Sequence, residues 1–251
     1  MTELRLEGVC KHFGGVEAVA DLSLAVPRGR ITGLIGPNGA GKSTVVNLVT
    51  GMLKVSSGRI LLGGTEITRD RPEAVARAGV ARTFQNIRLL QELSVLDNVV
   101  VGFHRHERTG LLENLVGWPS TRREKAAFVA RAEALLRRFS MEGDRDRLAG
   151  GLSYGHQRRV EMMRALALGP EILLLDEPVA GMNDVEAAEL GLIFRELAEE
   201  GVGILLIEHN VRFVRALCSH VYVINTGRLI AEGSADAVCS DQAVIDAYLG
   251  T

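Results

Sequence analysis

The strongest chemical signal in the sequence is a glycine-rich segment that lies between two apolar runs. Its residues are Gly36, Pro37, Asn38, Gly39, Ala40, Gly41, Lys42, Ser43 and Thr44. The setting predicts a strand, a tight turn and a helix start, and such a turn presents backbone N–H groups to an anion at the positive end of the helix. Lys42 is expected to reach the β- and γ-phosphates of a nucleoside triphosphate, and the Ser43 hydroxyl to bind Mg²⁺. An ordinary glycine-rich turn is the alternative, and the complete pattern disfavours it.

Two adjacent carboxylates close a second apolar run. Asp176 and Glu177 follow Ile172–Leu175, and a continuous apolar run is typical of a strand buried on both faces of a parallel sheet. Open α/β sheets bind ligands at the carboxyl ends of such strands. Asp176 is therefore expected in the Mg²⁺ shell, and Glu177 is expected to orient or deprotonate the water that attacks the γ-phosphate. The alternative, a pair of acidic turn residues, is weakened by the phosphate-binding segment upstream.

Five further residues have side chains or backbone groups suited to a nucleotide site. Gln85 ends a short apolar strand, and its carbonyl oxygen is able to bind Mg²⁺ or the attacking water, although an exposed loop glutamine is the commoner case. His209 ends another apolar run, where an imidazole is able to bond the γ-phosphate or the water. Phe13 offers a flat ring for an adenine, with a core position as the alternative. Ser153 and Gly155 start a helix and form either an anion site or an ordinary cap.

Composition and charge limit the kinds of protein that these residues can belong to. The chain has 251 residues, 47% hydrophobic and 24% charged, which is enough for one large core, or for a core with a small subdomain. Its 29 basic and 31 acidic residues give a formal charge of −2, so nucleic acid is not expected as the main partner. The three cysteines have neither metal-ligand nor disulfide-framework spacing, which fits a reducing compartment.

The hydrophobic patterns predict where the candidate residues are held. Alternating segments at 4–26 and 58–64 predict a small antiparallel sheet, whereas helical signals dominate from 93 to 159 and predict an inserted helical part. The opening residues lack the apolar run of a signal peptide, and no run of about 18 apolar residues is present. We therefore expect an α/β protein whose association with a membrane, if any, occurs through other proteins.

The order of these motifs resembles the ABC ATPase cassette over essentially the whole chain. The resemblance implies a P-loop NTPase (RecA-like) fold with a mostly parallel core, an N-terminal antiparallel β-subdomain and an inserted α-helical subdomain, and it implies ATP and Mg²⁺ as cofactors. The expected organisation is a single cassette over 1–251, in which 1–86 and 160–251 form the nucleotide-binding core with the β-subdomain. Residues 87–159 are then the α-helical subdomain with the signature motif.

The resemblance also implies a role for each matching residue. These are the adenine-stacking aromatic (Phe13), the Walker A contacts (Gly39–Thr44), the Q-loop (Gln85), the signature (Leu152–His156), the Walker B metal residue (Asp176), the catalytic glutamate (Glu177), the D-loop end (Asn183) and the switch histidine (His209). The signature departs from the common Leu-Ser-Gly-Gly-Gln, because Tyr154 replaces a glycine and His156 the glutamine. Ser153 and Gly155, which hold the phosphate in the family, are kept.

Finer features are similar to the ATP-binding subunits of branched-chain amino acid importers. They are Arg82–Leu89, the extension at 102–119, Tyr154, Ala180–Asn183 and Ala247–Gly250. The resemblance implies a peripheral subunit on the cytoplasmic face of the cell membrane that powers uptake of branched-chain or related hydrophobic amino acids. Its implied partners are a second ABC ATPase subunit, two transmembrane permease subunits and, indirectly, a periplasmic or extracellular solute-binding protein.

Other ABC ATPases remain alternatives. One is the cassette of another transporter, for a different small solute or for lipid or lipopolysaccharide export. A DNA-repair ATPase would separate the motifs by a long coiled coil, and no sustained heptads intervene here. A translation-associated ATPase would usually carry two cassettes, and this chain has one.

The resemblance also implies a dimer. One surface of each cassette carries the P-loop and another carries Ser153 and Gly155, so two cassettes are expected to sandwich two ATP molecules head to tail.

Overall fold

The chain divides into two compact units that are described separately. The computed structural model describes residues 3–83, 87–103 and 119–249. One unit comprises Met1–Gln85 and Glu171–Thr251, and the other comprises Asn86–Pro170. The second unit ends later than the sequence suggested, because residue 159 lies inside one continuous helix, α6 (Tyr154–Ala167), that packs with the other helices of this unit.

A six-stranded, mostly parallel sheet forms the centre of the first unit. Its strand order is β10-β9-β3-β8-β7-β6, and among the described strands of this sheet only β9 and β10 pair antiparallel. The strands are β3 (Ile31–Ile35), β6 (Val80–Arg82), β7 (Ile172–Asp176), β8 (Gly203–Ile207), β9 (His220–Asn225) and β10 (Arg228–Gly233). Every residue of β3, β7 and β8 is buried, which is why these strands are almost wholly apolar, with Thr32 of β3 and Asp176 at the end of β7 as the exceptions. The predicted parallel core is confirmed.

A second, antiparallel sheet is built largely from the N-terminal part of the chain. Its order is β2-β1-β4-β5. The strands are β1 (Glu3–Phe13), β2 (Val16–Pro27), β4 (Ser57–Leu62) and β5 (Thr65–Glu66). Leu4 pairs with Val26 and Leu6 with Leu24, and all four side chains are buried, as the period-two pattern predicted. The buried side chains of this sheet and of the parallel sheet belong to one hydrophobic core.

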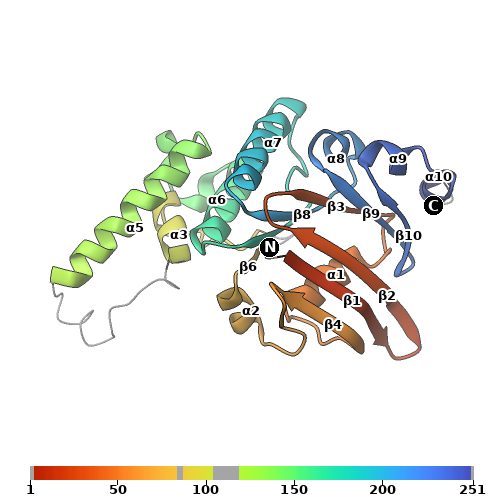
Figure 1. Ribbon diagram of the computed structural model, residues 1–251. Coiled ribbons are helices and arrows are strands. Elements are labelled where there is room, and N and C mark those ends of the chain that lie inside the picture. The colour runs from red at the N-terminus through yellow and green to blue at the C-terminus, as the bar shows by residue number, and fades with distance from the viewer. Residues whose placement is uncertain (1–2, 84–86, 104–118, 250–251) are drawn as a thin grey trace. The chain divides into compact units, whose positions relative to one another are not determined.

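The first unit contains six described helices, of which α7, α8 and α9 begin at side-chain caps. They are α1 (Lys42–Val49), α2 (Pro72–Ala78), α7 (Asp184–Glu199), α8 (Val211–Leu217), α9 (Ala235–Cys239) and α10 (Gln242–Leu249). Figure 1 shows α7 and α8 above the parallel sheet and α1 below it. Asn183 caps α7 in a capping box with Glu186, and Asn210 caps α8 by accepting a hydrogen bond from Phe213 N. These two caps set the residues at which α7 and α8 begin after the loops that follow β7 and β8.

The second unit is helical. It contains α3 (Val95–Gly102), α5 (Pro119–Arg138), two short 3₁₀ turns, η2 (Glu142–Asp144) and η3 (Ala149–Gly151), and α6. The Phe103 and Phe128 rings stack with centroids 5.6 Å apart, joining α5 to the residue that ends α3. Arg158 is fully buried on α6 and pairs with Glu161 at 2.9 Å. The helical subdomain predicted from the sequence is confirmed. Within the described ranges, every helix is too short or too polar to cross a lipid bilayer.

Two glycines of the antiparallel sheet allow a matched test of backbone packing. Gly58 (φ 88°) and Gly64 (φ 84°) share a left-handed conformation, but a Cβ at Gly58 would lie 2.3 Å from the Gly8 carbonyl oxygen, whereas one at Gly64 would meet nothing within 4 Å. The left-handed conformation alone costs an alanine roughly 1–2 kcal/mol. We expect Gly58→Ala to lower the free energy of unfolding by about 1–3 kcal/mol more than Gly64→Ala, because β1 and β4 must separate. Urea denaturation measures both, and equal losses would contradict the packing described.

Candidate functional site

The glycine-rich loop connects β3 to α1 with a backbone that side chains would obstruct. Gly36 has φ 155°, and a Cβ there would lie 2.0 Å from the Ile224 carbonyl oxygen. Gly41 has φ 105°, and a Cβ there would lie 2.6 Å from the Ala18 carbonyl oxygen. Gly39, at φ 79°, faces open space. The loop therefore packs tightly against neighbouring backbone on one side and leaves the other side open to a ligand.

Lys42 extends across this loop from the first position of α1. The residue is only 8% exposed, and its Nζ donates to the carbonyl oxygens of Gly36 at 2.6 Å and Pro37 at 2.9 Å. Burial lowers the pKa of Lys42 below its ordinary value, while the nearby carboxylates of Glu177 and Asp176 act to raise it. The ammonium group is thus held at the loop, where it is able to meet an anion.

The loop and the strand-end carboxylates line one cavity of about 300 Å³. Its lining residues are Asn38, Gly39, Ala40, Gly41, Lys42, Ser43, Thr44, Asp176 and Glu177. Ser43 supplies a hydroxyl and Asp176 a carboxylate, both hard oxygen donors of the kind that Mg²⁺ prefers. The described residues contain no group of three or more His, Cys, Asp or Glu side chains that could hold a metal by themselves.

Glu177 and His209 approach each other at the carboxyl ends of β7 and β8. Glu177 has φ 49°, an uncommon backbone conformation for this residue type, and its N–H donates to the Ile207 carbonyl oxygen at 2.9 Å. His209 Nδ1 lies 3.8 Å from Glu177 Oε1 and 3.8 Å from Glu208 Oε2, and its side chain is 63% exposed. The structure thus brings together a carboxylate and an imidazole that the sequence separates by more than a helix.

The remaining predicted residues lie elsewhere or outside the described ranges. Phe13 is 47% exposed at the end of β1, with Lys11 Nζ 4.9 Å from its ring centroid, so the alternative of a core position is wrong. Ser153 and Gly155 belong to the second unit. The Ser153 hydroxyl accepts from His156 N at 3.4 Å and so caps α6. Gln85 lies outside the described residues.

Sequence reasoning missed one buried carboxylate in this region. Glu208 immediately follows β8 and is 1% exposed, and burial raises its pKa while hydrogen bonds from the backbone act in the opposite direction. The available signal was an acidic residue at the end of an apolar strand, directly before His209. A charged residue at that point is unexpected in a buried element.

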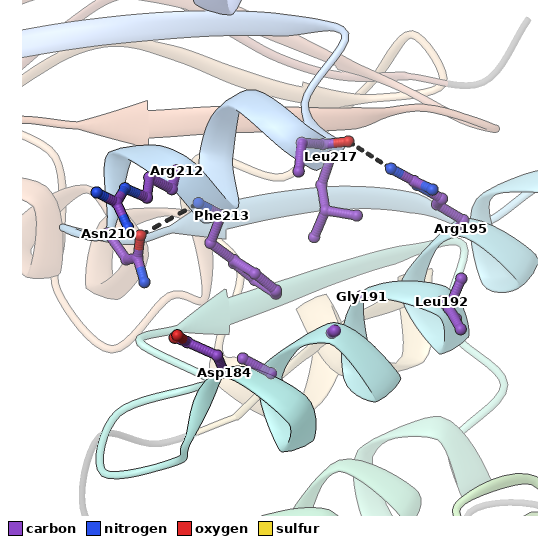
Figure 2. Close-up of a pocket in the computed structure, with 11 residues that line it drawn as sticks. Asp184, Gly191, Leu192, Arg195, Asn210, Arg212, Phe213 and Leu217 are labelled. Atoms are coloured by element: carbon purple, nitrogen blue, oxygen red, sulfur yellow. Dashed lines mark hydrogen bonds between the residues drawn. The ribbon is translucent and has the colours of Figure 1, made fainter.

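A second cavity of about 410 Å³ lies between α7 and α8. Figure 2 shows Gly191 and Leu192 on α7 facing Phe213 and Leu217 on α8, with Arg195 at one end. Arg195 Nη2 donates to the Ala216 carbonyl oxygen at 2.6 Å. The lining of this groove includes none of the glycine-rich loop residues and neither strand-end carboxylate of β7.

Comparisons with known proteins find relatives that match nearly the whole chain. A family model described as ABC transporter matches residues 19–180, and one described as branched-chain amino acid ATP-binding cassette transporter matches residues 228–251. The chain is 40% identical over 248 residues to the high-affinity branched-chain amino acid transport ATP-binding protein LivG of Escherichia coli (strain K12), covering 98% of this chain and 97% of that protein.

Other relatives include the lipopolysaccharide export system ATP-binding protein LptB of Haemophilus influenzae, which is 34% identical over 251 residues, 100% of this chain and 98% of that protein. A crystal structure of the ADP conformation of an ATP-binding cassette from an ABC transporter superimposes with a TM-score of 0.86, at 34% identity, covering 100% of both chains.

Removing the Lys42 side chain should weaken ATP binding. A charge-assisted contact to phosphate contributes about 1.5–3 kcal/mol, so we expect Lys42→Ala to reduce ATP affinity by about ten- to a hundredfold. Lys54→Ala is the matched control, because Lys54 is exposed and lies outside the cavity of the loop. Equilibrium binding of a fluorescent ATP analogue measures both. Unchanged affinity in Lys42→Ala, with the fold intact by circular dichroism, would exclude this role for the lysine.

Proposed function

Because the chain belongs to the ABC transporter family and is an ATPase coupled to transport, we propose that it powers uptake of branched-chain or related hydrophobic amino acids. The observation that carries the choice of solute is the match of residues 228–251 to the branched-chain amino acid cassette family. The phosphate-binding motifs occur in all ABC ATPases and cannot distinguish one solute from another. The 40% identity to the E. coli protein supports the same choice.

In this proposal the cavity at the loop holds the phosphates of ATP. The loop's N–H groups and Lys42 contact phosphate oxygens, and the Phe13 ring stacks on the adenine. Ser43 and Asp176, with Gln85, would hold Mg²⁺, which supplies charge neutralisation at the β- and γ-phosphate oxygens. The fit rests on hard oxygen donors beside a phosphate-binding loop.

Glu177 then acts on the attacking water. It orients the water and accepts a proton as the water oxygen bonds to the γ-phosphorus, and the bond from that phosphorus to the bridging oxygen breaks to give ADP and inorganic phosphate. His209, whose Nδ1 lies 3.8 Å from Glu177 Oε1, is proposed to bond the γ-phosphate or the water. Gln85 is proposed to bind the attacking water or Mg²⁺ through its carbonyl oxygen.

We propose one cassette per chain, with the first unit binding nucleotide and the second carrying the signature motif. A second ABC ATPase subunit, identical or a sister chain, would place its Ser153 and Gly155 on the γ-phosphate bound by the first. Two transmembrane permease subunits would use the resulting motion, and a periplasmic or extracellular solute-binding protein would deliver the solute. The chain would then lie peripherally on the cytoplasmic face of the cell membrane, with no role for nucleic acid.

One alternative has specific support. The lipopolysaccharide export ATPase of H. influenzae is 34% identical over the full chain, so an export function with a different cargo is the second candidate. Its identity is lower than that of the E. coli amino acid transport protein. The two candidates require different membrane partners, which makes them separable by experiment.

Replacing the proposed catalytic glutamate should separate ATP binding from hydrolysis. Glu177→Gln keeps the size of the side chain but removes the proton acceptor, so we expect ATP binding to persist, an ATP-bound dimer to accumulate and turnover to fall by at least about a hundredfold. Glu199→Gln, an exposed change on α7, serves as the control. Phosphate release and size-exclusion chromatography with ATP are the measurements. Normal turnover in Glu177→Gln would rule out this role.

Reconstitution tests the choice of solute. We expect the ATPase, assembled with its permeases in liposomes, to be stimulated several-fold by a solute receptor loaded with leucine, isoleucine or valine, because closure of the cassettes is coupled to delivery of the solute. An empty receptor is the control. Stimulation by lipopolysaccharide or another lipid, and not by any amino acid, would favour the export alternative.

A further inference from the structure

The buried carboxylate of Glu208 joins two loops that carry proposed catalytic groups. Its Oε1 accepts a hydrogen bond from Val179 N at 3.2 Å, and its Oε2 accepts one from His209 N at 3.2 Å. A further backbone bond comes from Asn210. Val179 lies two residues beyond Glu177. One side chain therefore connects the backbone that follows Glu177 to the backbone that carries His209.

Both loops need such an anchor. Glu177 holds a left-handed backbone conformation, φ 49°, which persists only where the surroundings enforce it. The bond from Glu177 N to the Ile207 carbonyl oxygen fixes one end, and the bond from Val179 to Glu208 fixes the backbone two residues later. The His209 side chain is mostly exposed, so its position depends mainly on its backbone.

A carboxylate is the side chain that suits this position. It presents only acceptors, whereas a glutamine would turn an N–H₂ donor toward one of the backbone N–H groups. Burying a charged group is unfavourable, and a leucine at this position would avoid that cost. The burial of a charge does not explain a glutamate at position 208. The need to accept several backbone hydrogen bonds at one point explains it.

The hydrogen bonds of Glu208 are a separate connection from the side chains that pack between α7 and α8. Figure 2 shows Asp184 and Asn210, at the starts of α7 and α8, on opposite walls at one end of the groove. Away from that end, the helices meet through the Phe194 and Phe213 rings, 6.4 Å apart, and through the bond from Arg195 to the Ala216 carbonyl oxygen. The hydrogen bonds of Glu208 join the chain segments that lead into the two helix starts.

We propose that Glu208 is a positioning residue that holds the Glu177 loop and the His209 loop at a fixed separation, so that hydrolysis of ATP depends on it and ATP binding does not. The inference rests on the proposed function of Glu177 and His209. Glu208 itself lies outside the lining of the loop cavity, so it acts through the backbone of its neighbours.

The kinetic test compares Glu208→Gln and Glu208→Leu with the unchanged chain. A displacement of about 1 Å at reacting groups is enough to slow a reaction a hundredfold, so we expect kcat to fall at least about tenfold while KM for ATP changes by less than about twofold. Tyr222→Phe is the control, because it removes a part-buried hydrogen bond of this unit, from Ala25 N at 3.2 Å, and Tyr222 lies outside the lining of the loop cavity. If Glu208 contributed only to stability, Tyr222→Phe would lower kcat to the same extent as the Glu208 variants when the loss of stability is equal.

Hydrogen exchange without nucleotide provides a readout independent of activity. We expect the amides of Val179 and His209 to exchange faster in both variants, and that of Ile204, bonded to the Arg30 carbonyl oxygen at 2.9 Å, to stay protected. If Glu208→Leu fails to fold, Glu208→Gln carries the test, since it keeps the size and one acceptor oxygen. Unchanged kcat and unchanged exchange in Glu208→Gln would overturn the proposal. Absence of ATP hydrolysis by the unchanged chain would instead reject the proposed function. The exchange data would still test whether Glu208 holds the Glu177 and His209 loops together.

Discussion

The alignment of three buried parallel strands is the constraint on which the site depends. Leu34 of β3 and Asp176 of β7 both pair with Ile207 of β8, so the three strands end side by side. The glycine-rich loop begins directly after β3, Asp176 is the last residue of β7 and is followed by Glu177, and His209 comes two residues after the end of β8. Because hydrogen bonds in a parallel ladder fix register along the whole strand, a shift in any of the three would disperse the groups that line or adjoin the cavity.

Polar groups at the end of an apolar core are stable only when the backbone satisfies them. Lys42 donates to two carbonyl oxygens of its own loop, and Glu208 accepts from the backbone of both loops. Asp176 is also buried, and it lines the same cavity as Lys42. These bonds offset part of the desolvation of each charge and leave the groups with little freedom to move. The same interactions that permit burial therefore give the site its defined geometry.

The evidence for the family of the protein and the evidence for its solute come from different parts of the chain. The model of the ABC transporter family matches residues 19–180, which include the glycine-rich loop and the carboxylates of β7. The more specific branched-chain amino acid match covers only residues 228–251, from β10 to the C-terminal end of the sequence. The loop and the carboxylates thus lie within the general family match, whereas the support for the solute comes from a segment outside the cavity of the loop.

The sequence by itself determined the elements and most of the candidate groups. Continuous apolar runs predicted the buried parallel strands, alternation predicted the antiparallel sheet, and the glycine-rich segment predicted the anion-binding turn, because each depends on residues near one another in the chain. Only the tertiary structure decided that His209 lies 3.8 Å from Glu177, that Glu208 joins their loops, that Phe13 is exposed, and that the helical unit continues through α6. Those features follow from contacts between distant segments, whose register and packing no local pattern specifies.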